Sequence, residues 1–415
     1  MRYDVIVVGA GPAGSTAARE CASRGLSVLL LDKAEFPRDK PCGGGVTVRA
    51  ARLLPFDLAP VTERTISSVQ FSLRQTGAFT RQASQPLTYL TQRRHLDRLL
   101  LERATNAGVV LRQRAPVRAI EREAAHVVVR AGGEAFVGRT LVAADGANGQ
   151  TARLAGVNVR RRMTIALEGN IAPSDSAGFP PRWEGTLGFD LGTLPGGYGW
   201  IFPKGDHLNV GAWGATHVGP RLRGALDRVA RYYGFDPAGL RGLRGHHLPV
   251  RQPGAPLVDG QMLLVGDAAG LLDPFTGEGI YGAIWSGRIA AAHLAAYLGN
   301  HAPDLRGYAR QVGCEFLPEL RAASQLADLF HLIPATYMRL GRYTPFSWRL
   351  ICRLSRGEQT YLDLRRALGP LALGLDLASD LLRATPWLQR RAGLHDVPVP
   401  ARFFRRGVRH HHTPT

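Results

Sequence analysis

Hydrophobic residues at the start of the chain follow the pattern of a strand, a glycine turn, a helix and a second strand. Tyr3 to Val8 is an apolar run rich in β-branched residues, and Gly9 to Gly14 is a glycine-rich turn. Ser15 to Ser23 has helical spacing, and Leu26 to Leu31 is again apolar. A helix that connects two buried strands in this way pairs them in parallel, so we expect a βαβ unit at the amino terminus.

The pattern changes further along the chain. Arg93 to Ala107 has helical spacing, short strands follow up to Ala143, and a last apolar strand lies at Met262 to Val265. Residues 161–250 are strand-rich and aromatic, whereas the chain beyond Ser286 is almost wholly helical, with Pro345, Pro370 and Pro386 expected to separate helices. We therefore predict an α/β fold with a Rossmann-type domain, an inserted antiparallel β-sheet domain and a helical C-terminal region. The expected boundaries are 1–66, 91–158 and 248–300 for the first domain, 67–90 and 159–247 for the second, and 301–415 for the helices.

Composition narrows the classes of protein that fit. The 415 residues are 45% hydrophobic and 20% charged, as in an ordered globular chain. The net charge is +19, but only Lys33, Lys40 and Lys204 are lysines among 52 basic residues, an arginine excess that GC-rich coding sequence also produces. No basic block is interleaved with aromatic residues, the four cysteines contain no CxxC pair, and no apolar run is long enough to span a bilayer. We expect no nucleic-acid partner, no metal site and no membrane-spanning helix.

The glycine-rich turn has the chemistry of a dinucleotide site. Because its glycines lie between a strand and a helix, backbone N–H groups and the positive helix end can approach a pyrophosphate. Asp32 ends the second strand 21 positions after Gly11, where a carboxylate can hold a ribose hydroxyl. The residues expected to bind the nucleotide here are Gly9, Gly11, Ala13, Gly14, Asp32 and Lys33.

Two later motifs each place a carboxylate at the end of a strand. Asp145 and Gly146 follow one strand, and Gly266 and Asp267 follow another. Either aspartate alone is more often a turn or helix cap. Together with the glycine turn, and with Arg93 in an Arg-x-x-Leu-Asp segment, these motifs resemble the three-part signature of FAD-dependent oxidoreductases built like aromatic-ring hydroxylases. The resemblance implies FAD as the cofactor, with Asp145, Gly146, Gly266, Asp267 and Arg93 beside it.

Three further segments narrow this resemblance. Residues 37–45 read PRDKPCGGG, residues 195–203 read PGGYGWIFP, and residues 273–280 read DPFTGEGI. They are similar to motifs of the geranylgeranyl reductase family, whose members reduce isolated double bonds in prenyl chains. The resemblance implies that Cys42, Gly43, Gly44, Gly277, Gly279 and Ile280 lie at the flavin.

The second of these segments predicts an apolar slot for substrate. Tyr198, Trp200 and Phe202 alternate along a strand and therefore share one face, where aromatic rings can line an isoprenoid and stabilise developing positive charge. A packing stripe in a sheet core is the alternative. An isolated alkene accepts hydride poorly unless a proton is supplied, and Cys42 and Tyr198 are the two candidate proton donors, although a free cysteine is more often inert. Arg38 and Lys40 either neutralise the cofactor or belong to a solvated loop.

These features predict an FAD-dependent oxidoreductase that saturates double bonds of a geranylgeranyl-type chain with hydride from reduced flavin. An FAD-dependent monooxygenase acting on an aromatic or lipophilic substrate is the alternative, and a non-enzymatic flavin protein is a weaker one. A halogenase is disfavoured because no lysine lies between Lys40 and Lys204. No second GxGxxG unit appears, so NAD(P)H and reduced ferredoxin both remain open as electron donor. The substrate is open among a prenylated lipid, a quinone and a prenyl diphosphate.

The last third of the chain carries a signal for location. Arg349, Arg353 and Arg356 recur at helical spacing beside Trp348 and Ile351, which is typical either of a basic helix on an anionic membrane or of a surface helix packed on the core. Since the chain starts with a structural strand, we expect a cytoplasmic protein, with peripheral contact at the inner face of the membrane as a further option. The oligomeric state and the number of bonds reduced stay open.

Overall fold

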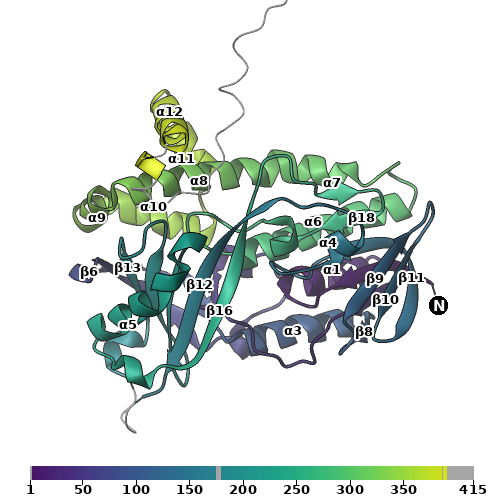
Figure 1. The fold of residues 1–415 in the computed structure, drawn as a ribbon, viewed down its shortest axis with the longest axis horizontal. Coiled ribbons are helices and arrows are strands. Elements are labelled where there is room, and N and C mark those ends of the chain that lie inside the picture. Colours follow the sequence, from purple (N-terminus) through teal and green to yellow (C-terminus); the bar gives the residue numbers. More distant parts are fainter. Residues whose placement is uncertain (1, 174–178, 386, 390–415) are drawn as a thin grey trace, which may run out of the picture.

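The computed structural model of the chain describes residues 2–173, 179–385 and 387–389. Three sheets and a group of helices make up the molecule. The first sheet lies at the right in Figure 1, the long strands of the second sheet run down its middle, and the C-terminal helices lie along the top.

The first sheet is built around the predicted βαβ unit. Its order is β17-β18-β11-β1-β2-β8, with β9 and β10 attached beyond β11, and β1 runs parallel to both β2 and β11. These central strands read as continuous apolar runs because both of their faces are covered. The strands are β1 (Arg2–Val8), β2 (Val28–Leu31), β8 (Val110–Arg112), β9 (Val117–Arg122), β10 (Val127–Ala131), β11 (Glu134–Ala143), β17 (Val258–Asp259) and β18 (Met262–Leu264).

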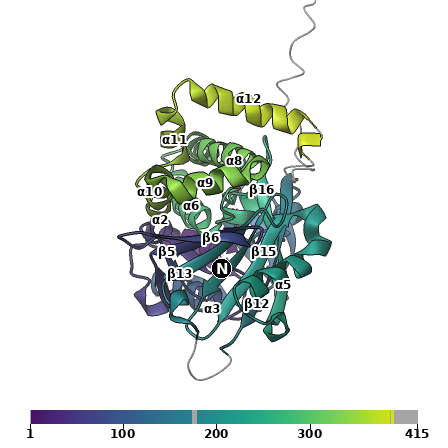
Figure 2. The same cartoon turned by 90° about the vertical axis from the view of Figure 1, so that its left-hand side faces the viewer.

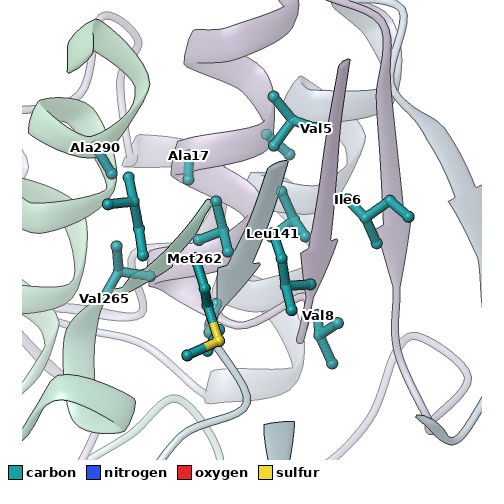
Figure 3. Packing of buried hydrophobic residues seen from close by; sticks show 14 of the residues in the cluster. Val5, Ile6, Val8, Ala17, Leu141, Met262, Val265 and Ala290 are labelled. Atoms are coloured by element: carbon teal, nitrogen blue, oxygen red, sulfur yellow. The ribbon is translucent and has the colours of Figure 1, made fainter. Parts of the chain in front are cut away.

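Two helices, α1 and α6, pack closely against each other over this sheet. Small residues permit the approach: a Cβ added at Gly287 of α6 would lie 2.6 Å from the carbonyl oxygen of Ala13 in α1. Figure 3 shows Ala17 of α1, Ala290 of α6 and Met262 of β18 in the same buried cluster. The helices of this region are α1 (Pro12–Ala22), α3 (Arg93–Asn106), α4 (Thr151–Leu154), α6 (Ile280–Leu298) and α7 (Arg306–Gln311).

The second sheet has the order β16-β12-β15-β14-β13-β5-β6. The sheet is mainly antiparallel, as predicted, with one parallel pair between β5 and β13. A parallel pair needs a long crossover connection, and here the chain passes through the first sheet between β6 and β13. The strands are β5 (Ser68–Leu73), β6 (Thr76–Gln82), β12 (Arg161–Ile171), β13 (Thr186–Leu191), β14 (Tyr198–Pro203), β15 (Leu208–Ala215) and β16 (Arg241–Arg251), and α5 (Leu222–Tyr232) packs on the outer face.

A third, small sheet joins the first two. Its order is β3 (Gly45–Thr47), β7 (Thr88–Leu90) and β4 (Arg64–Ile66), with α2 (Val48–Ala51) following β3. Strand β7 falls in the range assigned to the inserted domain, yet it pairs with strands from residues 1–66. The domain boundaries therefore stay a prediction. Short 3-10 turns lie at Ala59–Val61, Pro181–Trp183, Thr216–Arg221, Pro237–Gly239 and Gly266–Ala269.

The described part of the C-terminal region is helical, as predicted. A π-helical turn (Val312–Phe316) leads into α8 (Leu317–Leu332), α9 (Pro334–Tyr343), α10 (Pro345–Arg356), α11 (Tyr361–Ala367) and α12 (Leu371–Ala384). Pro345 begins α10 and Pro370 precedes α12, whereas Pro386 lies outside the described residues. Among the described helices, none combines the length and the apolar character needed to cross a membrane.

Helix α10 carries the basic stripe noted in the sequence. Trp348 is buried and donates its Nε1–H to the carbonyl oxygen of Gln82 at 3.0 Å, so this apolar side packs on the core. Arg349 and Arg353 are exposed on the other side, and Arg356 pairs with Glu358.

Candidate active site

The glycine turn joins β1 to α1 in a conformation that requires glycine. Gly9 has φ +103°, and a Cβ at Gly14 would collide with the carbonyl oxygen of Gly9. Gly11 is the N-cap of α1, and no described side chain caps the first turn. Its N–H groups and the positive end of the helix are therefore free to bind an anion.

Asp32 holds this turn from the end of β2. Its Oδ2 accepts the Ala10 N–H at 2.7 Å, and its Oδ1 accepts the Ala34 N–H at 2.8 Å. Each carboxylate oxygen retains a further lone pair for a ligand hydroxyl. Lys33 is exposed and lies outside the cavity described below.

The two later motifs differ in what their aspartates do. Asp145 accepts the N–H of Thr151 at 2.8 Å and its hydroxyl at 2.7 Å, so its carboxylate caps α4. Gly146 and Asp267 both line the cavity. Gly266, with φ +55°, donates its N–H to Ser286 Oγ at 2.9 Å and so fixes the second turn to α6.

Buried positive charge gathers beside the glycine turn. Arg93 makes two 2.8 Å hydrogen bonds to Asp97, and Arg38 reaches the same carboxylate at 3.1 Å. Lys40 lines the cavity, and burial, together with the charge of Arg93, lowers its pKa. These three cations share Asp97 and Asp267, so this end of the cavity attracts an anionic group.

Two residues that the sequence analysis missed complete this end. His246 on β16 has a buried Nε2 without a hydrogen-bond partner among the described residues, and burial followed by the charge of Lys40 lowers its pKa to about 4. Arg161 donates to the carbonyl oxygens of Gly146, Asp267 and Ala268 at 3.3–3.4 Å, which joins the two later motifs.

The Cys-Gly-Gly-Gly loop is held by its backbone. The Cys42 N–H donates to Glu168 Oε1 at 2.9 Å, and the Gly44 N–H lies 3.3 Å from the Cys42 sulfur. A Cβ at Gly43 would lie 2.7 Å from the Phe202 ring, and one at Gly44, where φ is +68°, would overlap the carbonyl oxygen of Thr91. The two glycines therefore allow the loop to pack closely between the Phe202 ring and the backbone of Thr91.

Lys204 holds this loop in place through hydrogen bonds to backbone carbonyl oxygens. Its Nζ donates to the carbonyl oxygens of Gly43 at 2.5 Å and Thr91 at 3.1 Å. Burial lowers the pKa of Lys204 to about 8, and burial raises that of its neighbour Glu168. Together the two side chains grip the peptide on either side of Cys42.

The aromatic wall has its polar atoms satisfied. Tyr198, Trp200 and Phe202 all line the cavity, as expected for alternate residues of β14. The Tyr198 hydroxyl donates to the carbonyl oxygen of Thr276 at 2.6 Å, and Trp200 Nε1–H donates to Asn209 Oδ1 at 2.8 Å. Burial raises the pKa of Tyr198, so the phenol keeps its proton at neutral pH. The cavity is therefore lined here by aromatic rings whose polar atoms are bonded within the protein.

The segment 273–280 is held by an ion-pair network that the sequence analysis missed. Arg49 of α2 contacts Glu278 at 2.5 Å and Asp273 at 3.3 Å, and the Tyr361 hydroxyl donates to Asp273 at 2.9 Å. Gly277, Gly279 and Ile280 line the cavity where α6 begins, with no side-chain cap on that helix among the described residues. The free N–H groups at this helix start favour negative charge on a ligand.

One continuous cavity of about 450 Å³ connects these parts. It begins at Gly11 and Ala13, passes Arg93 and Cys42, and ends among apolar side chains of the second sheet and the C-terminal helices. The expected cofactor residues that do not line the cavity are Gly9, Gly14, Asp32, Lys33, Asp145 and Gly266. The apolar end is lined by Val69, Phe71, Leu187, Phe189, Leu191, Trp213, Phe275, Phe330, Ile351 and Leu354.

Known proteins share both this sequence and this fold. Residues 2–176 match a family model described as an FAD binding domain. A geranylgeranyl diphosphate reductase of Rhodobacter capsulatus is 33% identical over 76% of this chain and 82% of its own length. A menaquinone reductase of Mycobacterium tuberculosis is 32% identical over 70% of this chain and 76% of its own. The chain belongs to the geranylgeranyl reductase family.

Solved structures agree on the fold. A geranylgeranyl bacteriochlorophyll reductase-like protein of Thermoplasma acidophilum has a TM-score of 0.69 and 23% identity, covering 94% of this chain and 98% of that one. The flavin-dependent brominase Bmp2 has a TM-score of 0.67 and 20% identity, covering 86% of this chain and 94% of its own. The fold is therefore common to family members and halogenases, and does not by itself separate their activities.

As a family member, the protein is an FAD-dependent oxidoreductase, and the residues of the cavity fit that cofactor. The uncapped start of α1 and the cations around Lys40 suit a pyrophosphate, and the free Nε2 of His246 offers a further contact. Cys42 lines the cavity together with this polar end and the aromatic wall. Bound FAD, when reduced, supplies a hydride.

One argument from the sequence needs correction. The halogenase was disfavoured because of where lysines occur along the chain, yet folding brings two of the three lysines to the site. Lys40 lines the cavity at its nucleotide end, whereas Lys204 lies behind the loop and outside the lining. Because only three of the 52 basic residues are lysines, the presence of a lysine at position 204 was a signal in the sequence that could have identified this residue.

Proposed function

We propose that this protein saturates isolated double bonds in a prenyl chain, with bound FAD as hydride source. The observation that carries the proposal is the single cavity that joins the cation-rich glycine turn to an aromatic, apolar end, with Cys42 where the two meet. The apolar end accommodates a chain of isoprene units and keeps water from the reacting carbons.

The aromatic wall has a direct role in this proposal. Protonating an isolated alkene places positive character on the carbon that then accepts the hydride, and each ring face near a cation contributes about 0.5–2 kcal/mol. Tyr198, Trp200 and Phe202 present such faces because their polar atoms are bonded elsewhere.

The proton comes from Cys42 or Tyr198 in this mechanism. The Cys42 thiol lies in a loop fixed by Glu168 and Lys204, beside the Arg93 guanidinium. The Tyr198 hydroxyl already donates to the carbonyl oxygen of Thr276, so it would have to leave that acceptor in order to protonate substrate. We therefore favour Cys42, with Tyr198 holding the chain.

We propose the substrate and the electron donor only as chemical classes. A prenylated lipid, a prenyl diphosphate or a prenylated quinone each carries an isolated trisubstituted alkene that this cavity suits. Electrons come from NAD(P)H bound transiently or from reduced ferredoxin. We place the protein in the cytoplasm, in peripheral contact with the membrane that dissolves its substrate.

The deciding experiment is an anaerobic single turnover. The flavoprotein is photoreduced, geranylgeranyl diphosphate or a menaquinone in detergent is added, and the flavin spectrum is followed alongside product mass. Reoxidation with a mass gain of two hydrogens per reduced bond supports the reductase and identifies the substrate class. Flavin that stays reduced with every prenyl substrate contradicts it.

A monooxygenase is the second candidate, because the same fold serves aromatic-ring hydroxylases and the cavity is aromatic. It is distinguished by admitting air to the photoreduced protein in the presence of an aromatic substrate. A product heavier by one oxygen atom would establish that activity instead.

A further inference from the structure

Helix α12 directs polar side chains toward the rest of the protein and most of its leucines toward the surroundings. A helix that packs on a protein core normally has the opposite orientation. The polar side of α12 faces α8 and α11: Asp376 pairs with Arg365 of α11, and Asp328 of α8 accepts the Ser379 hydroxyl at 2.8 Å and contacts Arg383 at 2.6 Å. Most of its leucines face outward, and Leu373, Leu377 and Leu381 are 65%, 69% and 59% exposed, whereas Leu382 is buried. The ion pairs hold the helix in this orientation, so the exposed leucines are part of the fold.

Exposed large apolar side chains concentrate in this region. Of those that the described chain exposes, all but Leu243 lie between residues 333 and 387. Helices α9 and α10 contribute Leu340, Tyr343 and Phe346, which are 46%, 73% and 66% exposed. In both Figure 1 and Figure 2, α9 and α12 lie in the end of the molecule built from the C-terminal helices. Such a concentration of exposed apolar side chains indicates an interaction surface.

Arginines lie among these apolar residues. Arg339, Arg342 and Arg349 are exposed and form no ion pair within the described residues. By contrast, Arg365 and Arg383, which face inward on α11 and α12, are both paired with carboxylates. The surface therefore presents unneutralised positive charge beside aromatic and aliphatic side chains, the combination that anionic lipid headgroups and acyl chains complement.

The same helices form the apolar end of the cavity. Phe330 of α8 and Ile351 and Leu354 of α10 line it. The opposite side of α10 carries Phe346 and Arg349. One helix thus separates the outer surface from the place where a prenyl chain would lie.

We propose that this surface docks on an anionic lipid bilayer and that the prenyl chain enters the cavity from the bilayer past α10. The docking face consists of Leu340, Tyr343, Phe346, Leu373, Leu377 and Leu381 with Arg339, Arg342 and Arg349. Docking stands on the surface alone, whereas the entry route rests on the proposed reductase function. A bilayer fits better than a second copy of this chain, because a like-charged copy would bring the unpaired arginines together.

Vesicle sedimentation tests the docking. The full-length protein is mixed with phosphatidylcholine vesicles that contain or lack phosphatidylglycerol. The triple variant Leu373→Gln/Leu377→Gln/Leu381→Gln should partition at least about tenfold less into the mixed vesicles. Leu243→Gln is the control, because Leu243 is an exposed leucine outside the proposed docking face. This variant should bind vesicles as the native chain does.

Charge is tested separately. Arg339→Gln/Arg349→Gln should lose most of the preference for phosphatidylglycerol, whereas Arg112→Gln/Arg118→Gln, which removes two exposed arginines from the first sheet, should retain it. Bound FAD and circular dichroism verify that each variant is folded. Absence of vesicle binding by the native chain, or binding unchanged in the leucine variant, overturns the docking face. A dimer that dissociates in the leucine variant while vesicle binding is absent assigns the surface to a second copy.

Turnover separates the entry route from the function on which it rests. The leucine variant should reduce detergent-dispersed substrate at the native rate but lose most activity on substrate embedded in vesicles. Equal loss in both assays overturns the entry route. If the native protein reduces no prenyl substrate in detergent, the proposed function fails, while the sedimentation result still decides the docking face.

Discussion

Cys42 is the residue on which the proposed chemistry turns. Its loop is fixed at the Cys42 N–H and the Gly43 carbonyl, so the thiol can be removed without moving the backbone. Cys42→Ala should retain FAD and slow the single-turnover reduction of a prenyl alkene at least about tenfold, the lower range for loss of a general acid. Cys314→Ala, at an exposed cysteine, is the control. An unchanged rate would assign the proton to Tyr198, which Tyr198→Phe then tests.

Lys204 gives the site a pH dependence that stability can report. Its pKa falls from 10.5 in an unfolded chain to about 8 in the folded one because the side chain is buried. Between these values the unfolded chain binds the extra proton, so the free energy of unfolding rises with pH, by about 3 kcal/mol at about 1.36 kcal/mol per pKa unit. Urea unfolding of Lys204→Met should lack this rise, and Lys33→Met, at an exposed lysine, should keep it. Parallel pH curves for both variants and the native chain would contradict the assignment.

Residues with a local signal could be predicted, and those that act across the fold could not. The glycines at positions 9 and 14 follow from the turn, and the shared face of Tyr198, Trp200 and Phe202 follows from strand periodicity. Glu168 and Lys204 have no local motif, because their importance comes from meeting the Cys42 loop, which lies more than a hundred residues away. Asp145 shows the opposite case: it has a recognisable local motif, but its carboxylate bonds to Thr151 at the start of α4 and lies outside the cavity lining.

At the scale of elements, hydrophobic periodicity predicts where helices and strands lie better than it predicts which strands pair. The strand Tyr3 to Val8 and the helix from Arg93 appear within a residue or two of their expected ends. The parallel pairing of β5 with β13 was missed because register between distant strands has no trace in either segment alone. The exposed leucines of α12 were missed for a related reason, since an apolar stripe does not reveal whether it faces protein or surroundings.

The close contact between α1 and α6 can be tested by substituting a glycine at the contact. Gly287→Ala would place a methyl group 2.6 Å from the carbonyl oxygen of Ala13, at the turn that leads into α1. We expect a loss of about 1–3 kcal/mol in the free energy of unfolding, typical of overpacking, together with faster FAD release. Gly374→Ala, where nothing lies within 4 Å of the added methyl, should instead stabilise α12 by up to about 1 kcal/mol. Thermal unfolding with flavin fluorescence measures both, and equal effects would refute the close contact.

Over the whole molecule, the site is assembled where three sheets meet. Glycine turn, cysteine loop, aromatic strand and C-terminal helices come from residues 9–14, 42–45, 198–203 and 317–356, and only the fold brings them around one cavity. The sequence predicts the three kinds of region and their chemistry through resemblance. It does not predict that they share a single continuous space.

That continuity implies thermodynamic coupling between the two ligands. FAD at the polar end and a prenyl chain at the apolar end would occupy the same cavity, so each should slow the release of the other, and linkage requires their affinities to change by the same factor. Each ligand also raises the melting temperature by stabilising the folded chain. We therefore expect geranylgeraniol to raise the melting temperature of the FAD-bound protein more than that of the stripped protein, and to slow FAD dissociation measured by fluorescence. Trp213→Ala, which opens the apolar end, should weaken this effect, because Trp213 lines the cavity and contacts the Tyr198 ring. Shifts that merely add, with FAD release unaffected by geranylgeraniol, would mean that the two ends of the cavity bind independently.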